Sequence, residues 1–279
     1  MRKLIVRLSV AALVVGAAFS WSARVSTQWL KYPTAGLPKT ADGKPNLSAP
    51  TPRTADGKPD FSGIWLTNNT FCPPSQDPES LICGPELPMG KEGINMGMSL
   101  PGGLPYQPWL AALVKKRTAD EAKDDPHVVC RPNTFLRAYN MPHLLKFVQT
   151  PGLLVMLNEV NAGYRQVFTD NRPLPEDPNP SWQGYSSAKW EGDTLVVNST
   201  GFRDDLWIDW NGSMITSAAV VQERIRRPDY GHLEVGVTVD DPKAYTRPWT
   251  VTLRQRLAIN TELVDEICLE NEKSSQRMK

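Results

Sequence analysis

Residues 217–239 read SAAVVQERIRRPDYGHLEVGVTV, two runs of alternating apolar and polar residues joined by the turn PDYG. Successive side chains of a β-strand point to opposite faces, so this alternation places one row of each run on a buried face. Pro228 suits an early turn position and Gly231 a late one. The stretch therefore predicts an antiparallel hairpin of two half-buried strands.

Other runs rich in apolar and β-branched residues extend this pattern through the second half of the chain. NAG at 161–163 joins two of them as a hairpin, and Gly192 can take the positive φ that closes another. Besides the two strands of the opening hairpin, the runs that read as strands are LLKFVQ, GLLVMLNEV, YRQVFTD, the segment 182–190, TLVVN, PWTVTLRQRLAI and ELVDEICLE. A meander of this length hides its edges by closing on itself. We predict a mainly β fold, an antiparallel meander closing into a β-barrel, over the alternative of a two-sheet sandwich.

The N-terminus has the pattern of a secretory signal peptide at residues 1–20. Arg2, Lys3 and Arg7 precede a short apolar run, and small residues follow it at Ala18 and Ser20. The run is too short to remain as a membrane-spanning helix, although a retained anchor is the alternative. We therefore expect a periplasmic or secreted protein without permanent membrane insertion after cleavage.

The overall charge is close to neutral, with 31 Lys and Arg against 30 Asp and Glu. This balance gives no reason to expect nucleic acid or an anionic membrane as a partner. Proline, at 25 of 279 residues, is well above its usual share and argues against long helices. The sequence does not predict an oligomeric state.

The chain before the strands divides into three parts. Residues 21–59 are expected to be a flexible lead-in. A duplication with an offset of 14 residues, KTADGKPNLSAPTP followed by RTADGKPDFSGIW, begins in it at residue 39 and enters the domain with its second copy, and each copy carries a D-G-K-P turn signal. Residues 60–279 then form a single domain. Within it, the Pro-rich stretch 67–105 is an irregular cover, and an amphipathic helix is predicted at about 107–123.

Four cysteines in an exported chain favour two disulfides. Three pairings are possible, and we favour Cys72 with Cys83, closing a small loop, and Cys130 with Cys268, tying the start of the strand region to its end. A zinc site is the competing interpretation, but the spacing contains no CxxC pair.

Glu223 is the leading candidate for acid or base chemistry. It falls in the same strand row as Val221 and Ile225, and a carboxylate among apolar side chains has its pKa raised unless it is paired. Arg165 and His143 are candidates for stabilising negative charge beside it. The competing interpretations are a structural Glu223–Arg165 pair, a Glu159–Arg165 pair across the hairpin, and a structural role for His143.

The long segment 199–217, STGFRDDLWIDWNGSMITS, is the other candidate site. Tryptophans beside carboxylates suit a flat ligand with hydrogen bonds at its rim, although the same rings could close the barrel end as core. The candidate ligand-binding residues are Glu159, Trp182, Trp190, Trp207, Asp209, Trp210 and Gln255, the last being the polar exception in its inward row. Ser186 in GYSSA does not match the G-x-S-x-G pattern of serine hydrolases.

No cofactor and no metal are expected. The three histidines, His127, His143 and His232, form no HExxH or H-x-H motif. Glycine-rich phosphate-binding loops are also missing from the sequence. A calcium site on the aspartates of 199–217 has no EF-hand spacing to support it.

Several motifs together resemble a family of exported bacterial proteins: TADGKPDFSGIW, FVQTPGLLVMLNE, YRQVFTDNRPLP, WEGDTLVVNSTGF, QERIRRPDYGHLEVGVTVDDPKAYTRPWTV and ICLENEK. The resemblance covers about residues 60–275 and implies export without implying an activity. Such relatives often have a histidine where this chain has Leu174, so no catalytic role carries over there. The hairpins are also similar in style to those of lipocalin- and calycin-like barrels, an analogy of fold alone.

Three functions follow as hypotheses. The first is a β-barrel that binds a small apolar or aromatic ligand in its lumen, with tryptophans near the mouth. The second is a cofactor-free lyase, isomerase or hydrolase that uses Glu223 as acid or base. The third is a cell-envelope interaction protein that docks through its Pro-rich segment.

Overall fold

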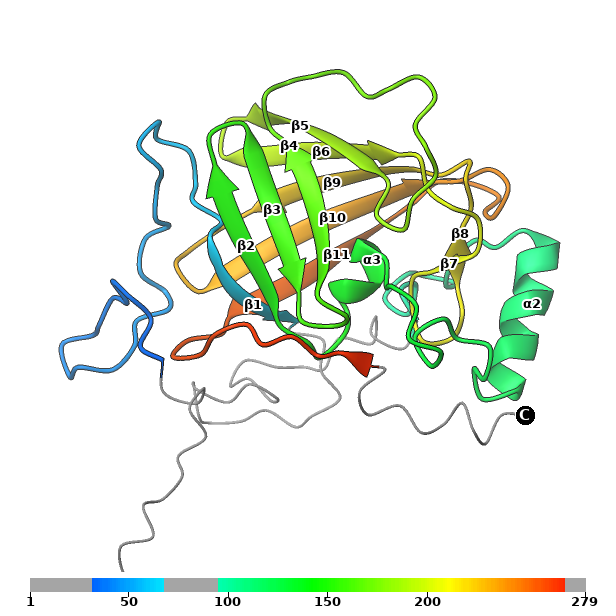
Figure 1. The fold of residues 1–279 in the computed structure, drawn as a ribbon, viewed down its shortest axis with the longest axis horizontal. Helices are drawn as coiled ribbons and strands as arrows, with labels where there is room; N and C mark the ends of the chain where they lie inside the picture. The colour runs from blue at the N-terminus through cyan, green and yellow to red at the C-terminus, as the bar shows by residue number, and fades with distance from the viewer. Residues whose placement is uncertain (1–31, 68–94, 269–279) are drawn as a thin grey trace, which may run out of the picture.

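The computed structural model describes residues 32–67 and 95–268 of the chain (Figure 1). The predicted signal peptide, the predicted Cys72–Cys83 bridge and most of the predicted cover at 67–105 lie outside the described residues.

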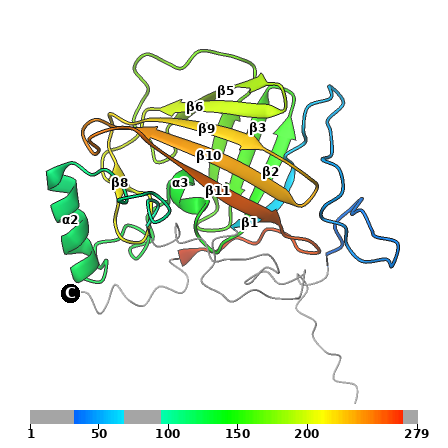
Figure 2. The same cartoon turned by 180° about the vertical axis from the view of Figure 1, so that it is seen from behind.

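Within the described part, the centre of the fold is a closed barrel of nine strands, in the order β1-β11-β10-β9-β6-β5-β4-β3-β2 (Figures 1 and 2). This confirms the predicted mainly β, calycin-like barrel. The barrel strands are β1 (Gly63–Thr67), β2 (Leu145–Thr150), β3 (Leu153–Asn158), β4 (Gly163–Phe168), β5 (Tyr185–Glu191), β6 (Thr194–Thr200), β9 (Val220–Arg226), β10 (His232–Asp240) and β11 (Trp249–Leu257).

The barrel departs from the predicted meander in two ways. Strands β4 and β5 pair in parallel, over two residue pairs, because residues 169–184 carry the chain back across the barrel between them. Strand β6 pairs with β9, since β7 (Leu206–Trp207) and β8 (Met214–Ile215) leave the barrel and form a small sheet of their own.

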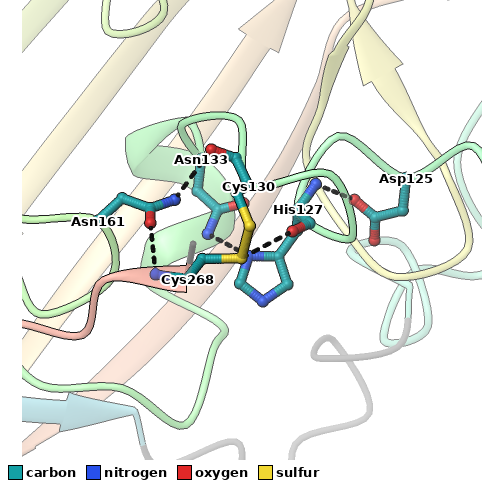
Figure 3. The surroundings of a disulfide bond; sticks show 6 residues. All are labelled: Asp125, His127, Cys130, Asn133, Asn161 and Cys268. Carbon is teal, nitrogen blue, oxygen red and sulfur yellow. Dashed lines mark hydrogen bonds between the residues drawn. A yellow bond between two sulfur atoms is a disulfide. The ribbon is translucent and has the colours of Figure 1, made fainter. Parts of the chain in front are cut away.

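The prediction that ELVDEICLE forms a final strand is wrong. Its described part, residues 262–268, contains no strand, and Glu266 makes an isolated bridge to Val160. The segment instead crosses one end of the barrel and is fixed there by a disulfide between Cys130 and Cys268, with an S–S distance of 2.00 Å (Figure 3). This confirms the predicted pairing of those two cysteines.

The predicted alternation is confirmed in β9, where Val221, Glu223 and Ile225 are buried while Arg224 and Arg226 are exposed. The same holds in β11 from Trp249 to Gln255, which is buried, but not at the end of the strand, where Arg256, expected in the outer row, is buried as well. These rows, with the inward rows of the other strands, form one apolar core.

A short helix that the sequence did not predict, α3 (Phe135–Ala138), closes part of one barrel end. Thr134 caps it, with its hydroxyl accepting the Arg137 N–H. Tyr139 follows directly and is fully buried among the core residues. The helix α2 (Pro108–Ala119) begins with the predicted proline and ends four residues before the predicted 123. In the described residues, no helix combines the length and the apolar composition needed to cross a membrane.

The described part of the predicted lead-in, residues 32–59, contains two turns and contacts the barrel. Both copies of the duplicated motif form the same turn, with bridges Lys39–Pro45 and Arg53–Pro59. The chain between them is anchored to the barrel, since Leu47 O accepts the Gly231 N–H at 2.7 Å and Ala49 O accepts the Tyr230 N–H at 2.8 Å.

Candidate functional site

A cavity of about 520 Å³ opens in the barrel wall between β4 and β5. It exists because these strands share only two residue pairs, at Val167–Ser186 and Phe168–Ser187, and diverge on either side of them. The cavity has an aromatic lining, made by Tyr164, Phe168, Trp182 and Tyr185. We call this cavity the wall cleft.

The aromatic side chains of the wall cleft are held by stacking. Phe168 and Tyr185 lie with ring centroids 5.4 Å apart, and the Arg172 guanidinium lies 3.9 Å from the Phe168 centroid. The Arg203 guanidinium lies 5.3 Å from the Trp182 ring. Tyr164, by contrast, is 66% exposed, so it forms the outer rim and can move toward a ligand.

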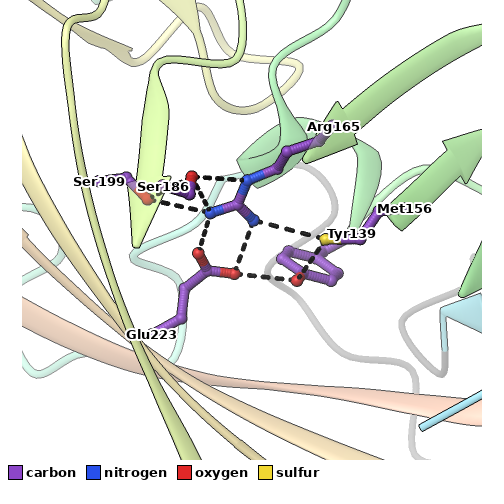
Figure 4. A network of polar contacts seen from close by, with 6 residues as sticks. All are labelled: Tyr139, Met156, Arg165, Ser186, Ser199 and Glu223. Carbon is purple, nitrogen blue, oxygen red and sulfur yellow. Dashed lines mark hydrogen bonds and ion pairs between the residues drawn. The ribbon is translucent and has the colours of Figure 1, made fainter. Parts of the chain in front are cut away.

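Two polar residues of the wall cleft, Arg165 and Ser186, belong to a buried network (Figure 4). Arg165 makes a two-point ion pair with Glu223, in which Nη1 donates to Oε1 at 3.1 Å and Nη2 donates to Oε2. The Tyr139 hydroxyl donates to the same Oε1 at 2.9 Å. Arg165 also stacks on Phe135, with its guanidinium carbon 3.4 Å from the ring centroid.

Both members of the ion pair are buried, since Arg165 is 3% exposed and Glu223 is 0% exposed. A buried charge is tolerated when it is paired and fully hydrogen-bonded, and both oxygens of Glu223 are engaged here. Burial, reinforced by the negative charge of Glu223, raises the pKa of Tyr139 well above its usual value. The tyrosine hydroxyl therefore stays protonated and keeps donating to Glu223.

This arrangement corresponds to the structural Glu223–Arg165 pair, which was one of the alternatives that the sequence left open. The predicted alternative, a Glu159–Arg165 pair, is wrong. Glu159 instead accepts the Leu144 N–H at 2.8 Å and lies 3.8 Å from His143 Nδ1. Both oxygens of Glu223 are thus already engaged, Oε1 by Tyr139 and Arg165 and Oε2 by Arg165.

The hydroxyl pair Ser186 and Ser199 completes the network. Arg165 donates to Ser186 from Nε and Nη2, at 3.2 and 3.0 Å, and from Nη2 to Ser199 at 3.0 Å. The two hydroxyls also share one hydrogen bond of 2.9 Å. Because two hydroxyl hydrogens share one such bond, one hydrogen has no acceptor among the described residues. When Ser199 donates to Ser186, that hydrogen belongs to Ser186, which lines the wall cleft.

Gln183 provides the complementary group. Its Nε2 donates to the Asn133 carbonyl at 2.7 Å, which fixes the orientation of the amide. Its Oε1 is buried and accepts no hydrogen bond from the described residues. Since Gln183 lines the wall cleft, this side of the barrel holds one buried acceptor without a partner among the described residues, close to a serine pair in which either hydroxyl can be the donor.

The other predicted site residues are dispersed. His143 Nδ1 lies 3.1 Å from Glu266, near the disulfide. Trp190 packs on Phe61, with centroids 5.3 Å apart, beside a second cavity of about 450 Å³ near the β5–β6 turn. Gln255 donates to the Tyr139 carbonyl at 2.8 Å inside the barrel.

The segment 199–217 does not reach the wall cleft with its tryptophans. Trp207 is buried against the Arg117 guanidinium, 4.4 Å from its ring centroid, whereas Trp210 is 41% exposed. Asp209 is buried, and it accepts the N–H groups of Met96 and Ser213 at 3.0 Å. Burial raises the pKa of the Asp209 carboxyl.

Of the predicted site residues, the wall cleft brings together Trp182 and Arg165, with Glu223 behind Arg165. Sequence reasoning missed Tyr139, Gln183 and Ser199, and it considered Ser186 only as a hydrolase nucleophile. The two serines could have been found from the hairpin closed at Gly192, because its register places Ser186 directly opposite Ser199.

Within residues 32–67 and 95–268, no group of three or more His, Cys, Asp or Glu side chains is arranged to hold a metal ion. Comparison of the sequence with protein-family models gave no match, and comparison with curated proteins gave none either.

Proposed function

We propose that the protein is an exported binding protein that holds a small planar aromatic molecule in the wall cleft. The observation that carries the proposal is the combination, in one cavity, of an aromatic lining, a buried acceptor (Gln183 Oε1) without a partner among the described residues, and Ser186, one of two hydroxyls that share a single hydrogen bond. Buried polar groups of folded proteins are almost always paired, so an unpaired set in a cavity is where a ligand gains binding energy.

The ligand class follows from these groups. A carbonyl oxygen accepts from Ser186, and an N–H or O–H group donates to Gln183 Oε1. The aromatic side chains favour a flat ring system, which stacks or packs edge-to-face on them. A cavity of about 520 Å³ is within the range of small-molecule sites, and it suits a one- or two-ring compound such as an aromatic amide or lactam.

The proposed ligand site is the wall cleft, whereas the sequence predicted a ligand in the barrel lumen. Tyr139 is buried inside the barrel, where its hydroxyl contacts Glu223 on β9 and lies 3.7 Å from Met156 Sδ on β3. Its main-chain carbonyl accepts from Gln255 on β11. Because Tyr139 fills space inside the barrel and contacts three of its strands, we favour the wall cleft as the place for a ligand.

Binding is favoured over catalysis because the acid-base candidate is already engaged. Glu223 contacts Arg165 and Tyr139 and would have to break this pair to take a proton. Export is supported by the N-terminal sequence pattern and by the Cys130–Cys268 bridge, since disulfides persist in oxidising compartments.

The test is a fluorescence titration with 2-quinolinone, a flat lactam that carries both a carbonyl and an N–H. Quinoline, which lacks the carbonyl and the N–H, is the matched control ligand. We expect saturable binding of 2-quinolinone that is about tenfold tighter than that of quinoline, because two hydrogen bonds of roughly 1 kcal/mol each are partly offset by desolvation.

Matched variants locate the site. Ser186→Ala and Ser199→Ala each remove one hydroxyl from Arg165, but only Ser186 lines the wall cleft, so only Ser186→Ala should weaken binding. Tyr164→Ala should also weaken it, whereas Tyr32→Ala, at a similarly exposed tyrosine outside the cleft, should not. Equal affinities for all four variants, or no saturable binding, would refute the proposal.

A further inference from the structure

One edge of the wall cleft is a strained turn. Asn161, Ala162 and Gly163 line the cavity and belong to the β3–β4 turn, in which the Gly163 N–H donates to Val160 O at 3.2 Å. Both central residues have positive φ, 54° at Asn161 and 47° at Ala162. This is the pattern of a type I′ turn, which favours Asn followed by Gly.

Ala162 occupies the position where glycine is preferred. A Cβ atom disfavours the left-handed conformation, so the turn needs support from its surroundings. That support comes from the C-terminal segment. The Asn161 N–H donates to Glu266 O at 2.6 Å, and the Glu266 N–H donates to Glu159 O at 2.8 Å.

The side chain of Asn161 links the turn to both halves of the disulfide (Figure 3). Its Oδ1 accepts the Cys268 N–H at 3.1 Å, and its Nδ2 donates to the Cys130 carbonyl at 3.4 Å. Cys130 itself has a positive φ of 58°, again a conformation that a side chain disfavours. Pro132, two residues further on, lines the wall cleft as well.

These contacts connect the Cys130–Cys268 bond to the β3–β4 turn, which forms one edge of the wall cleft. Residues 262–268 form no strand, and alongside the hydrogen bonds of Glu266 and Cys268 the Cys130–Cys268 bond is the covalent link that fixes their end. Cys130 and Cys268 are both half-buried, so a reductant can reach them. Without the bond, Cys130 and the Asn161–Ala162 turn are free to leave their left-handed conformations.

We propose that the Cys130–Cys268 disulfide is a redox switch for the wall cleft, which rests on the proposed function of that cleft. A dithiol reductant supplies two electrons, breaks the S–S bond and leaves two cysteine thiols, while the reductant becomes a disulfide. The freed C-terminal segment then releases the β3–β4 turn, and the aromatic ligand binds more weakly.

The experiment uses the full chain in a Cys72→Ser/Cys83→Ser background, so that dithiothreitol acts on one bridge. Two quantities are measured in the oxidised and reduced forms: the hydrogen exchange rate of the Asn161 amide and the dissociation constant of 2-quinolinone. We expect reduction to raise both by about tenfold or more, while exchange of the β5–β6 amides at Lys189 and Val196 stays unchanged.

Ala162→Gly is the decisive variant. Glycine adopts positive φ without cost, so the turn becomes Asn-Gly and no longer depends on the disulfide. We expect reduced Ala162→Gly to bind 2-quinolinone as tightly as the oxidised form does. A Cys130→Ser/Cys268→Ser variant should behave like the reduced protein with or without dithiothreitol.

The possible outcomes distinguish a failure of the redox switch from a failure of the proposed ligand function. Equal Asn161 exchange in the two redox forms would overturn the switch, and so would faster exchange with unchanged affinity. If reduction speeds Asn161 exchange but 2-quinolinone binds neither form, the turn is under redox control and the proposed ligand function is what fails.

Discussion

The buried Arg165–Glu223 pair should be structural, and Glu223→Gln tests this directly. The substitution removes the charge and replaces one accepting oxygen with an NH₂ group that faces the Arg165 guanidinium, donor against donor. Two unit charges about 4 Å apart interact by about 4 kcal/mol at an effective dielectric constant near 20. Breaking a buried pair by removing one partner costs about 3 to 5 kcal/mol, since the remaining charge stays buried.

The expected loss is large enough to measure by thermal and urea unfolding. For a domain of this size, about 2 to 4 °C of melting temperature corresponds to each kcal/mol, so Glu223→Gln should melt about 10 °C lower. Glu191→Gln is the control, because Glu191 pairs with Arg224 and Lys189 on the exposed face and its replacement should leave the melting temperature unchanged.

A double variant tests whether the loss in Glu223→Gln comes from the buried charge that is left unpaired. Arg165→Met/Glu223→Met removes both charges together, and it should be closer to wild type than Glu223→Gln by about 2 kcal/mol or more. If Glu223→Gln is as stable as wild type, or if the double variant is no more stable than Glu223→Gln, the pair is not the structural element described here.

Further predictions concern the disulfide, a glycine and a histidine. The Cys130–Cys268 bridge closes a loop with a sequence separation of 138, so Cys130→Ser/Cys268→Ser should lose up to about 5 kcal/mol of unfolding free energy in urea; a loss below about 1 kcal/mol would contradict this. Gly184→Ala should destabilise more than Gly192→Ala, because both glycines have positive φ but a Cβ at Gly184 would lie 2.6 Å from Thr200 O, whereas Gly192 faces open space; equal melting temperatures would refute the clash. Burial, with the nearby charge of Arg137, lowers the pKa of His127 below 6.5, so its contribution to stability is present above pH 6.5 and is lost as the pH falls toward the lower folded-state value. Urea unfolding at pH 7 and 5 should therefore show a loss that is smaller in His127→Gln, and an equal loss in both proteins would contradict this assignment.

The parts of the fold that follow from local patterns were predictable from sequence. Alternation in β9 and β11 placed Glu223 and Gln255 on the inner face, because strand periodicity depends only on neighbouring residues. The Gly192 turn and the start of α2 followed from glycine and proline at specific positions. The closed barrel followed from the need to hide strand edges.

Apart from the Cys130–Cys268 bridge, features that depend on distant contacts were not predicted. The sequence pattern of ELVDEICLE fits a strand. Its described residues are instead positioned by a bridge to the β3–β4 turn and by the disulfide. Glu159 and Arg165 are close in sequence, yet Arg165 is in the inward row opposite Met156 while Glu159 lies in the turn region beyond β3. The wall cleft itself arises from the parallel β4–β5 pairing, which depends on the path of residues 169–184 across the barrel.

The most direct test of the account is to locate bound 2-quinolinone by nuclear Overhauser effects to the isotopically labelled protein. The account predicts contacts from the ligand to the wall-cleft rings of Tyr164 and Tyr185, and none to the lumen side chains of Val237 and Leu253. Contacts to Val237 or Leu253 would place the ligand in the lumen and contradict the proposed site.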